Sequence, residues 1–148
     1  MDRPNIKIAI VGPESSGKST LAKQLAAHYQ TAQVPEYARE YLTKYGPKYT
    51  YEDVELIAKR QLALEQELSH QTGDLLICDT NLLVIKIWMM EVFERCTKWI
   101  EDEVEKNAYD LTILTSPDIP WEYDEFRENP SDRDRLFKIY KSELDKLK

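Results

Sequence analysis

A glycine-bearing loop near the amino terminus constrains the fold of this chain more than any other feature. Residues 12–19 read Gly-Pro-Glu-Ser-Ser-Gly-Lys-Ser and fit the spacing GxxxxGK[ST]. In such a loop the glycines let successive backbone amides face a phosphate, Lys18 reaches the outer phosphates, and the Ser19 hydroxyl ligates Mg²⁺. The residues expected to bind a nucleoside triphosphate and its metal are Gly12, Glu14, Ser15, Ser16, Gly17, Lys18, Ser19 and Thr20. The motif therefore predicts a buried strand, a phosphate-binding loop and a helix in immediate succession.

Short apolar runs alternate with helical patterns along the rest of the chain. We expect strands at Ile6–Val11, Thr31–Pro35, Leu75–Cys78 and Leu111–Thr115. Helices are expected from about Gly17 to Tyr29, from Tyr51 to about Ser69, from Thr80 and Asn81 through about Lys106, and from Ser131 to the end. This alternation predicts an α/β fold with a parallel sheet. No linker or repeat divides residues 1–148, so we expect one domain.

Two carboxylates follow expected strands and so fall at the carboxyl edge of the sheet, where doubly wound folds bind ligands. Asp79 ends the third strand and is a candidate partner of Mg²⁺ or a proton acceptor for an attacking hydroxyl; the plain alternative is a helix cap. Glu36 follows the second strand in the segment PEYARE. With Tyr37 and Arg39 it could cradle an acceptor, or Glu36 and Arg39 could form an ordinary surface pair.

Residues 116–135 are rich in aromatic and arginine side chains and are expected to form a lid over the transferring phosphoryl group. Arginine suits the charge that spreads over phosphoryl oxygens. Arg127 is the first candidate, followed by Arg133 or Arg135, although neighbouring carboxylates make structural ion pairs an alternative.

Composition excludes several classes of function. The formal net charge is -7 and the pI is near 4.9, which argues against a protein that mainly grips nucleic acid. Residues 1–50 hold 7 Lys and Arg against 4 Asp and Glu, so the basic surplus lies around the anion-binding loop. No apolar run is long enough to cross a membrane. Two cysteines without metal spacing, Cys78 and Cys96, indicate a reduced cytoplasmic protein.

The sequence has no guanine-reading NKxD motif, which excludes a small GTPase, and it is too short for a large ATPase machine. The remaining class is a compact kinase that phosphorylates a small acceptor. The segments GPESSGKSTL, PEYAREY, the strand ending CDT, and PWEYDEFRENPSDRDRLF cover nearly the whole chain. Together they resemble the ribosylnicotinamide kinase family, the kinase part of NadR-type NAD-salvage proteins.

The resemblance implies a three-layer P-loop nucleoside triphosphate hydrolase fold with helices on both faces of the sheet. It also implies phosphorylation of the 5′-hydroxyl of nicotinamide riboside by MgATP. By position, the resemblance implies that the loop and Arg133 bind ATP and that Ser19 and Asp79 bind the metal. The riboside would be bound by Glu36, Tyr37, Arg39 and Asp79. The residues that would act in catalysis are Lys18, Asp79, Glu36 and Arg127. Either Glu36 or Asp79 would accept the hydroxyl proton.

Two departures from the family and two rival functions stay open at this point. From these patterns we expect no fused adenylyltransferase domain in residues 1–148, and we expect the family's last strand to be absent after the final helix, through a truncated end or a true one. The rivals are a P-loop kinase of another nucleoside or small hydroxyl acceptor, and a non-enzymatic ATP-binding regulatory module. These sequence patterns do not determine whether the chain prefers ATP or GTP, or whether it forms a homo-oligomer.

Overall fold

The computed structural model describes residues 6–13, 16–46, 48–71, 74–116 and 133–147. Four parallel strands form one sheet in the order β2-β3-β1-β4. The strands are β1 (Ile6–Val11), β2 (Gln33–Val34), β3 (Leu75–Asp79) and β4 (Leu111–Leu114). The helices are α1 (Lys18–Tyr29), α2 (Tyr37–Tyr45), α3 (Tyr51–Gln71), α4 (Leu82–Phe93), α5 (Lys98–Lys106) and α6 (Arg133–Lys146). The expected α/β class and parallel sheet are confirmed.

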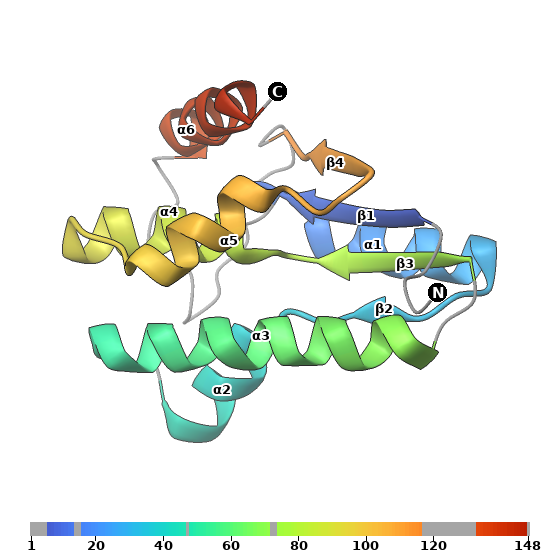
Figure 1. The fold of residues 1–148 in the computed structure, drawn as a ribbon, viewed down its shortest axis with the longest axis horizontal. Coiled ribbons are helices and arrows are strands. Elements are labelled where there is room, and N and C mark those ends of the chain that lie inside the picture. The colour runs from blue at the N-terminus through green and yellow to red at the C-terminus, as the bar shows by residue number, and fades with distance from the viewer. Residues whose placement is uncertain (1–5, 14–15, 47, 72–73, 117–132, 148) are drawn as a thin grey trace.

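The two faces of the sheet carry different helices (Figure 1). Ile10 of β1 and Ile77 of β3 pack with α1 on one face, whereas Ala9 and Cys78 point to the other face, toward α3. This division follows from the alternation of side chains along a strand. A larger apolar cluster joins α3, α4, α5 and α6 on the α3 side. The three-layer arrangement expected from the resemblance is confirmed.

The long helix expected from Thr80 through Lys106 is wrong, because the structure contains two helices there. Glu94 ends α4 in a left-handed conformation, with φ 57°, and Thr97 precedes α5 in an extended one. The break lets the strongly amphipathic α5 turn Ile100 and Val104 into the core beside α4. A continuous helix would have carried these side chains past the core.

Helix starts are better predicted than helix breaks. At the start of α3, the Thr50 amide donates to Asp53 and the Asp53 amide donates to the Thr50 hydroxyl, at 2.8 and 3.2 Å. This reciprocal pair is a capping box. Asn81 caps α4, since its side-chain oxygen accepts the Leu83 amide at 3.0 Å. The short helix α2 was not expected.

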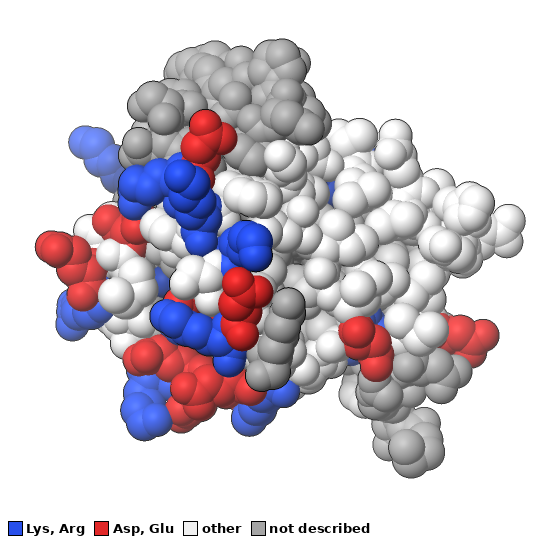
Figure 2. All heavy atoms as spheres, turned by 90° about the horizontal axis from the view of Figure 1, so that it is seen from above, with Lys and Arg blue, Asp and Glu red and all other residues white. Residues whose placement is uncertain are grey.

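Charged side chains of both signs stand side by side around α6 on the face shown in Figure 2. Lys146 pairs with Glu143 and Lys141 with Asp145 on that helix. Within the described ranges, no helix is both long and apolar enough to span a bilayer.

Candidate active site

The phosphate loop joins β1 to α1, as its motif predicts. Gly17 has φ 85° at the residue before α1, a conformation that glycine adopts without strain. Gly12 has φ 151°, and a Cβ there would collide with the Thr115 side chain and lie 3.0 Å from the Thr115 carbonyl oxygen. Both glycines are therefore required by the backbone. The amino terminus of α1 faces the loop and favours an anion by its dipole.

Lys18 lies at the centre of a cluster of polar side chains at the carboxyl ends of the strands. Its Nζ is 3.2 Å from Glu36 Oε2, 3.3 Å from Thr80 Oγ1 and 3.8 Å from Asp79 Oδ1. Ser19 donates its hydroxyl to Asp79 Oδ2 at 2.7 Å. The structure therefore joins the two carboxylates singled out in the sequence through the lysine and serine of the loop.

The two carboxylates have opposite pKa shifts. Burial raises the pKa of Asp79 above its ordinary value, and the nearby Glu36 charge adds to this, while Lys18 and Ser19 oppose it. Burial would also raise the pKa of Glu36, but the Lys18 charge and hydrogen bonds from Lys18 and Thr80 outweigh it, so that pKa is lowered. Glu36 is thus the more strongly held anion, and Asp79 carries the less stable charge.

Thr80 contacts this cluster, and its own backbone conformation is unusual for a threonine. Its φ is 86°, in a region that β-branched residues rarely adopt. The residue is buried, its amide donates to the Ile10 carbonyl at 3.0 Å, and its hydroxyl donates to Glu36 at 3.0 Å. The sequence patterns place Thr80 only at the start of an expected helix; its contact with Glu36 connects residues that are distant in the chain and leaves no local signal.

The donor set around Asp79 fits a magnesium ion. Asp79 Oδ1 is the one buried side-chain oxygen or nitrogen in the described part of the chain that has no hydrogen-bond partner. An unsatisfied carboxylate oxygen beside a serine hydroxyl is suited to a hard cation, which in such sites takes its other ligands from water and phosphate. No group of three or more His, Cys, Asp or Glu residues that could hold a metal by themselves is present in the described ranges.

A cavity of about 250 Å³ opens beside the loop. Loop residues form one end of it, and α2, α4 and α6 supply the remaining walls. The lining residues among those expected to act are Gly12, Ser16, Gly17, Lys18, Ser19, Thr20, Glu36 and Arg39. Ser16 takes part with its backbone, because its side chain is buried and turned toward β4. The volume suits a small molecule.

The far end of the cavity is aromatic. Trp88 of α4 donates its ring N–H to the Tyr49 hydroxyl at 2.9 Å, and the two rings meet edge to face with centroids 4.9 Å apart. Glu91 lies one turn beyond Trp88 and also lines the cavity. This end therefore offers ring surfaces beside a carboxylate, the surroundings that favour a flat cationic group.

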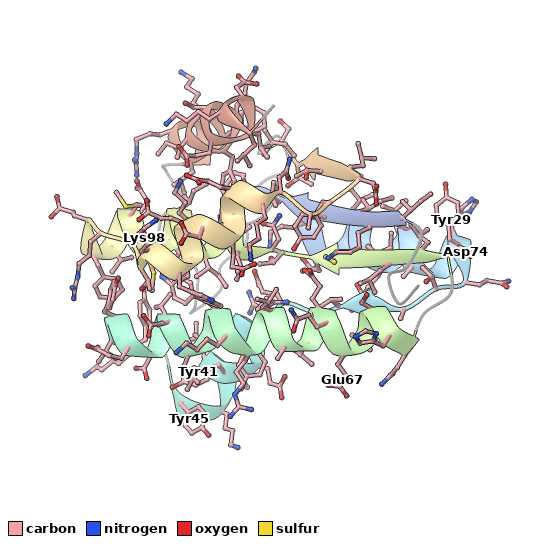
Figure 3. All side chains as sticks on the ribbon, viewed as in Figure 1. Tyr29, Tyr41, Tyr45, Glu67, Asp74 and Lys98 are labelled. Atoms are coloured by element: carbon pink, nitrogen blue, oxygen red, sulfur yellow. The ribbon has the colours of Figure 1, made fainter. Side chains whose placement is uncertain are left out.

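Tyr37, expected to contact an acceptor ring, is not part of the cavity wall in the structure. Its amide donates to Gln61 at 2.8 Å and its ring packs toward Tyr41. Figure 3 shows Tyr41 and Tyr45 following along α2, at the edge of the molecule below α3. Glu36 and Tyr37 are adjacent in sequence but point in different directions where the helix begins. Tyr49, which sequence analysis did not single out, occupies the wall instead.

Several expected site residues lie outside the described residues. These are Glu14, Ser15 and Arg127, together with most of the expected lid, and the side chain of Arg133 is also not described. Arg135 is described, and its guanidinium is 2.5 Å from Glu91 at the aromatic end of the cavity. For Arg135, the structure therefore shows the ion pair that was the alternative to a role in the lid.

Comparison with known proteins places this site in a family context. A family model described as an AAA domain matches residues 7–148. The trifunctional NAD biosynthesis/regulator protein NadR of Escherichia coli (strain K12) and that of Salmonella typhimurium are each 28% identical to this chain over 132 residues. The match covers 86% of this chain and 32% of each relative. The chain thus spans about a third of the length of these curated relatives.

Two solved structures share the fold. A crystal structure of NadR protein in complex with NAD and AMP-PNP superposes with a TM-score of 0.81 at 19% identity, over 97% of this chain and 41% of that one. A crystal structure of NadR protein in complex with NR gives a TM-score of 0.79 at 20% identity, over 97% of this chain and 42% of that one. At this identity the likeness concerns the arrangement of helices and strands.

Proposed function

Because this chain belongs to the family described as an AAA domain, we propose that it is a P-loop kinase that transfers the γ-phosphoryl group of ATP to the 5′-hydroxyl of nicotinamide riboside. One observation carries the proposal. A single cavity joins the phosphate loop and Glu36 at one end to the Trp88 and Tyr49 rings at the other. Its similarity to the NAD biosynthesis/regulator protein NadR, and to a NadR structure in complex with NR, supports the choice of acceptor.

The residues divide into a nucleotide side and an acceptor side. Backbone amides of the loop and Lys18 would bind the β- and γ-phosphates, and Ser19 with Asp79 would hold Mg²⁺, which when bound neutralises charge on the phosphate oxygens. Glu36 lines the cavity and would bind ribose hydroxyls. Arg39 on the same wall would contact the acceptor, and Arg127 with Arg133 would contact the transferring phosphoryl group.

Glu36 is the residue that we assign to receive the hydroxyl proton. Asp79 already accepts the Ser19 hydroxyl and is oriented to the metal side, whereas Glu36 faces the cavity. The transfer breaks the bond between the γ-phosphorus and the β–γ bridging oxygen and forms one to the acceptor oxygen, whose proton passes to Glu36. Since the transition state of phosphoryl transfer is loose, Lys18 and the arginines contribute more than the base does.

The acceptor side favours a cation over a neutral nucleoside. The pyridinium ring of nicotinamide riboside is positively charged, and cation–π contact with Trp or Tyr contributes roughly 0.5–2 kcal/mol. Glu36 and Glu91 also line the cavity, but Lys18 and Arg135 respectively pair with them, so the preference for a cation rests on the rings. The free thiols of Cys78 and Cys96 are compatible with the cytoplasm, where we place the reaction.

The test is ADP release from MgATP with nicotinamide riboside, with uridine, and with no acceptor. Riboside-dependent release that is lost in Lys18→Ala and kept in Lys23→Ala would support the proposal; Lys23 is an exposed lysine on the same helix. Release with uridine at equal efficiency would indicate a kinase of other nucleosides. Nucleotide binding without stimulation by either acceptor would instead indicate a regulatory module.

A further inference from the structure

Thr115, the residue that follows β4, lies directly beneath the phosphate loop. It is 8% exposed, its amide donates to the Val11 carbonyl at 2.9 Å, and its side chain fills the space beside Gly12. Its hydroxyl is 2.5 Å from the Ser16 hydroxyl and 3.2 Å from the Val11 carbonyl. Neither the motif nor the family resemblance assigns this residue a role.

Counting protons favours one direction for these hydrogen bonds. Ser16 and Thr115 have one hydroxyl proton each, but their oxygens make three hydrogen-bond contacts, the third being Ser16 Oγ to the Pro13 carbonyl at 2.5 Å. Val11 O already accepts the Thr115 amide. The arrangement that uses the two shortest contacts has Thr115 donating to Ser16 and Ser16 donating to Pro13.

This relay closes the phosphate loop on itself. Pro13 and Ser16 belong to the same loop motif, and the Ser16 side chain joins the two residues. Thr115 then ties the closed loop to the end of β4. The Pro13 carbonyl thereby has a hydrogen-bond donor within the protein, so this acceptor is satisfied in a loop whose motif is expected to present amide donors to a phosphate.

We propose that Thr115 is a positioning residue for triphosphate binding, which acts through Ser16 to hold the loop in its phosphate-binding shape. The inference rests on the proposed function only in taking a nucleoside triphosphate as the ligand of the loop. It does not depend on the acceptor. Removing the Thr115 hydroxyl leaves Ser16 with one donor fewer in a buried position, and loss of a buried partner weakens the dependent structure.

The experiment compares Thr115→Val with Thr115→Ser and with Thr112→Val. Valine keeps the shape of threonine without the hydroxyl, serine restores the hydroxyl, and Thr112 is a half-buried threonine on the same strand that does not reach the loop. Binding of Mg–AMP-PNP is measured by calorimetry, and KM values for ATP and for nicotinamide riboside by ADP release. Thermal unfolding of each variant is recorded alongside.

For Thr115→Val we expect Kd for Mg–AMP-PNP and KM for ATP to rise about tenfold, the size expected when a buried hydrogen bond loses a partner. KM for the riboside should stay unchanged, and Thr115→Ser should restore most of the nucleotide affinity. Ser16→Ala should weaken binding similarly, and the double variant Ser16→Ala/Thr115→Val should add little, because both act through one relay.

The inference is overturned if Thr115→Val binds Mg–AMP-PNP as the wild type does. It is also overturned if both KM values rise together with no rescue by serine, or if Thr112→Val has the same effect. Should Thr115→Val not fold, Thr115→Ala takes its place, with Thr115→Ser as the rescue and with the same outcomes. A wild-type protein that binds no Mg–AMP-PNP refutes the proposed function itself, and this inference with it, whereas binding without turnover refutes only the acceptor assignment.

Discussion

The sheet carries two lysine–carboxylate clusters that are similarly buried and differently built. At the carboxyl ends of the strands, the side chains of Lys18, Glu36 and Asp79 are 11%, 23% and 7% exposed. On the α3 side of the sheet, the side chains of Lys7 and Glu65 are 15% and 5% exposed, and their charged atoms lie 2.9 Å apart. Burial alone does not distinguish the two clusters.

Hydrogen bonding does distinguish them. Both oxygens of Glu65 have partners, since one pairs with Lys7 and the other accepts the Tyr109 hydroxyl at 2.5 Å. Lys7 also lies over the Tyr109 ring, 4.9 Å from its centroid. Burial, then the Glu65 charge, raises the pKa of the Tyr109 hydroxyl above its usual range, so it remains a donor. Asp79, in contrast, keeps one oxygen without a hydrogen bond.

The difference separates a cluster that stabilises the fold from one prepared for a ligand. A closed network gains nothing from an added cation or phosphate, whereas an unsatisfied buried carboxylate oxygen costs free energy that a bound ion would offset. We expect substitutions in the Lys7–Glu65 cluster to change stability and those in the Lys18 cluster to change activity.

The largest effect is expected for Lys18→Ala. Loss of the charge that binds the outer phosphates should lower kcat/KM by roughly 10³-fold, since removing one preorganised donor already costs about 10²–10³. Glu36→Gln should lower it much less, because the transition state is loose. Steady-state ADP release measures both, and comparable losses would contradict the roles given to the two sides.

Lys7→Met should have the next largest effect, which is a loss of folding stability. Breaking a buried ion pair leaves Glu65 without its counter-charge, at a cost of about 3 kcal/mol in the free energy of unfolding. The second change Glu65→Gln should recover much of this, because glutamine still accepts the Tyr109 hydroxyl. Urea titration measures the free energies. A fall in turnover per folded molecule would show that the two clusters are not separate.

Trp88→Leu should raise KM for nicotinamide riboside by about tenfold and leave KM for ATP unchanged. The sharper readout is the preference for the cationic riboside over its neutral dihydro form, which has nearly the same shape. That preference should fall in Trp88→Leu. A fall in affinity for both forms by the same factor would mean that Trp88 contributes apolar surface and no selection for charge.

The smallest expected change is a gain in stability for Asp79→Asn. Because the folded-state pKa of Asp79 is raised, its ionisation costs the fold free energy once the pH exceeds the ordinary aspartate pKa, and the cost is complete above the folded-state pKa. The variant should be more stable than wild type at neutral pH, by about 1 kcal/mol, and the difference should shrink as the pH falls below the folded-state pKa and vanish below the ordinary aspartate pKa. Its metal-dependent turnover should be lost.

Glu36 has the opposite linkage, which supplies the control for that measurement. Its lowered pKa means that its charge stabilises the fold above the ordinary glutamate pKa, a contribution that is lost as pH falls through the folded pKa. Thermal unfolding of Glu36→Gln against pH should therefore show lower stability than wild type at neutral pH and convergence in acid. The same sign for both variants would mean that the two carboxylates do not differ as described.

Much of the fold was predictable because its signals are local. The apolar run of β1, the glycine spacing of the loop and the Thr50–Asp53 pair each lie within a few neighbouring residues. The break between α4 and α5 was missed because Glu94, a residue that rarely adopts positive φ, ends α4 there. Packing of Ile100 against the core, which sequence periodicity alone does not reveal, favours that break.

Only those residues of the candidate site that lie at the carboxyl ends of strands could be predicted from the sequence. Lys18, Glu36 and Asp79 converge because parallel strands end at one edge, so topology alone brings them together. The Tyr49–Trp88 wall joins residues that are 39 positions apart, and Thr115 reaches Ser16 across 99 positions. Pairs of this kind leave no trace in spacing, and they arise only when the helices pack.

Helix α4 has a consequence for how proteins of this type could diversify. Its residues at 84, 87, 88, 91 and 92 line the cavity with helical spacing; of these, Ile87 belongs to the core and Val84 and Trp88 pack against it. Glu91 and Val92 are not part of that core cluster, so these two positions can change with the core and the phosphate loop left in place. Acceptor choice would then be an evolvable property of a single helical face, inherited separately from the ability to use a nucleoside triphosphate.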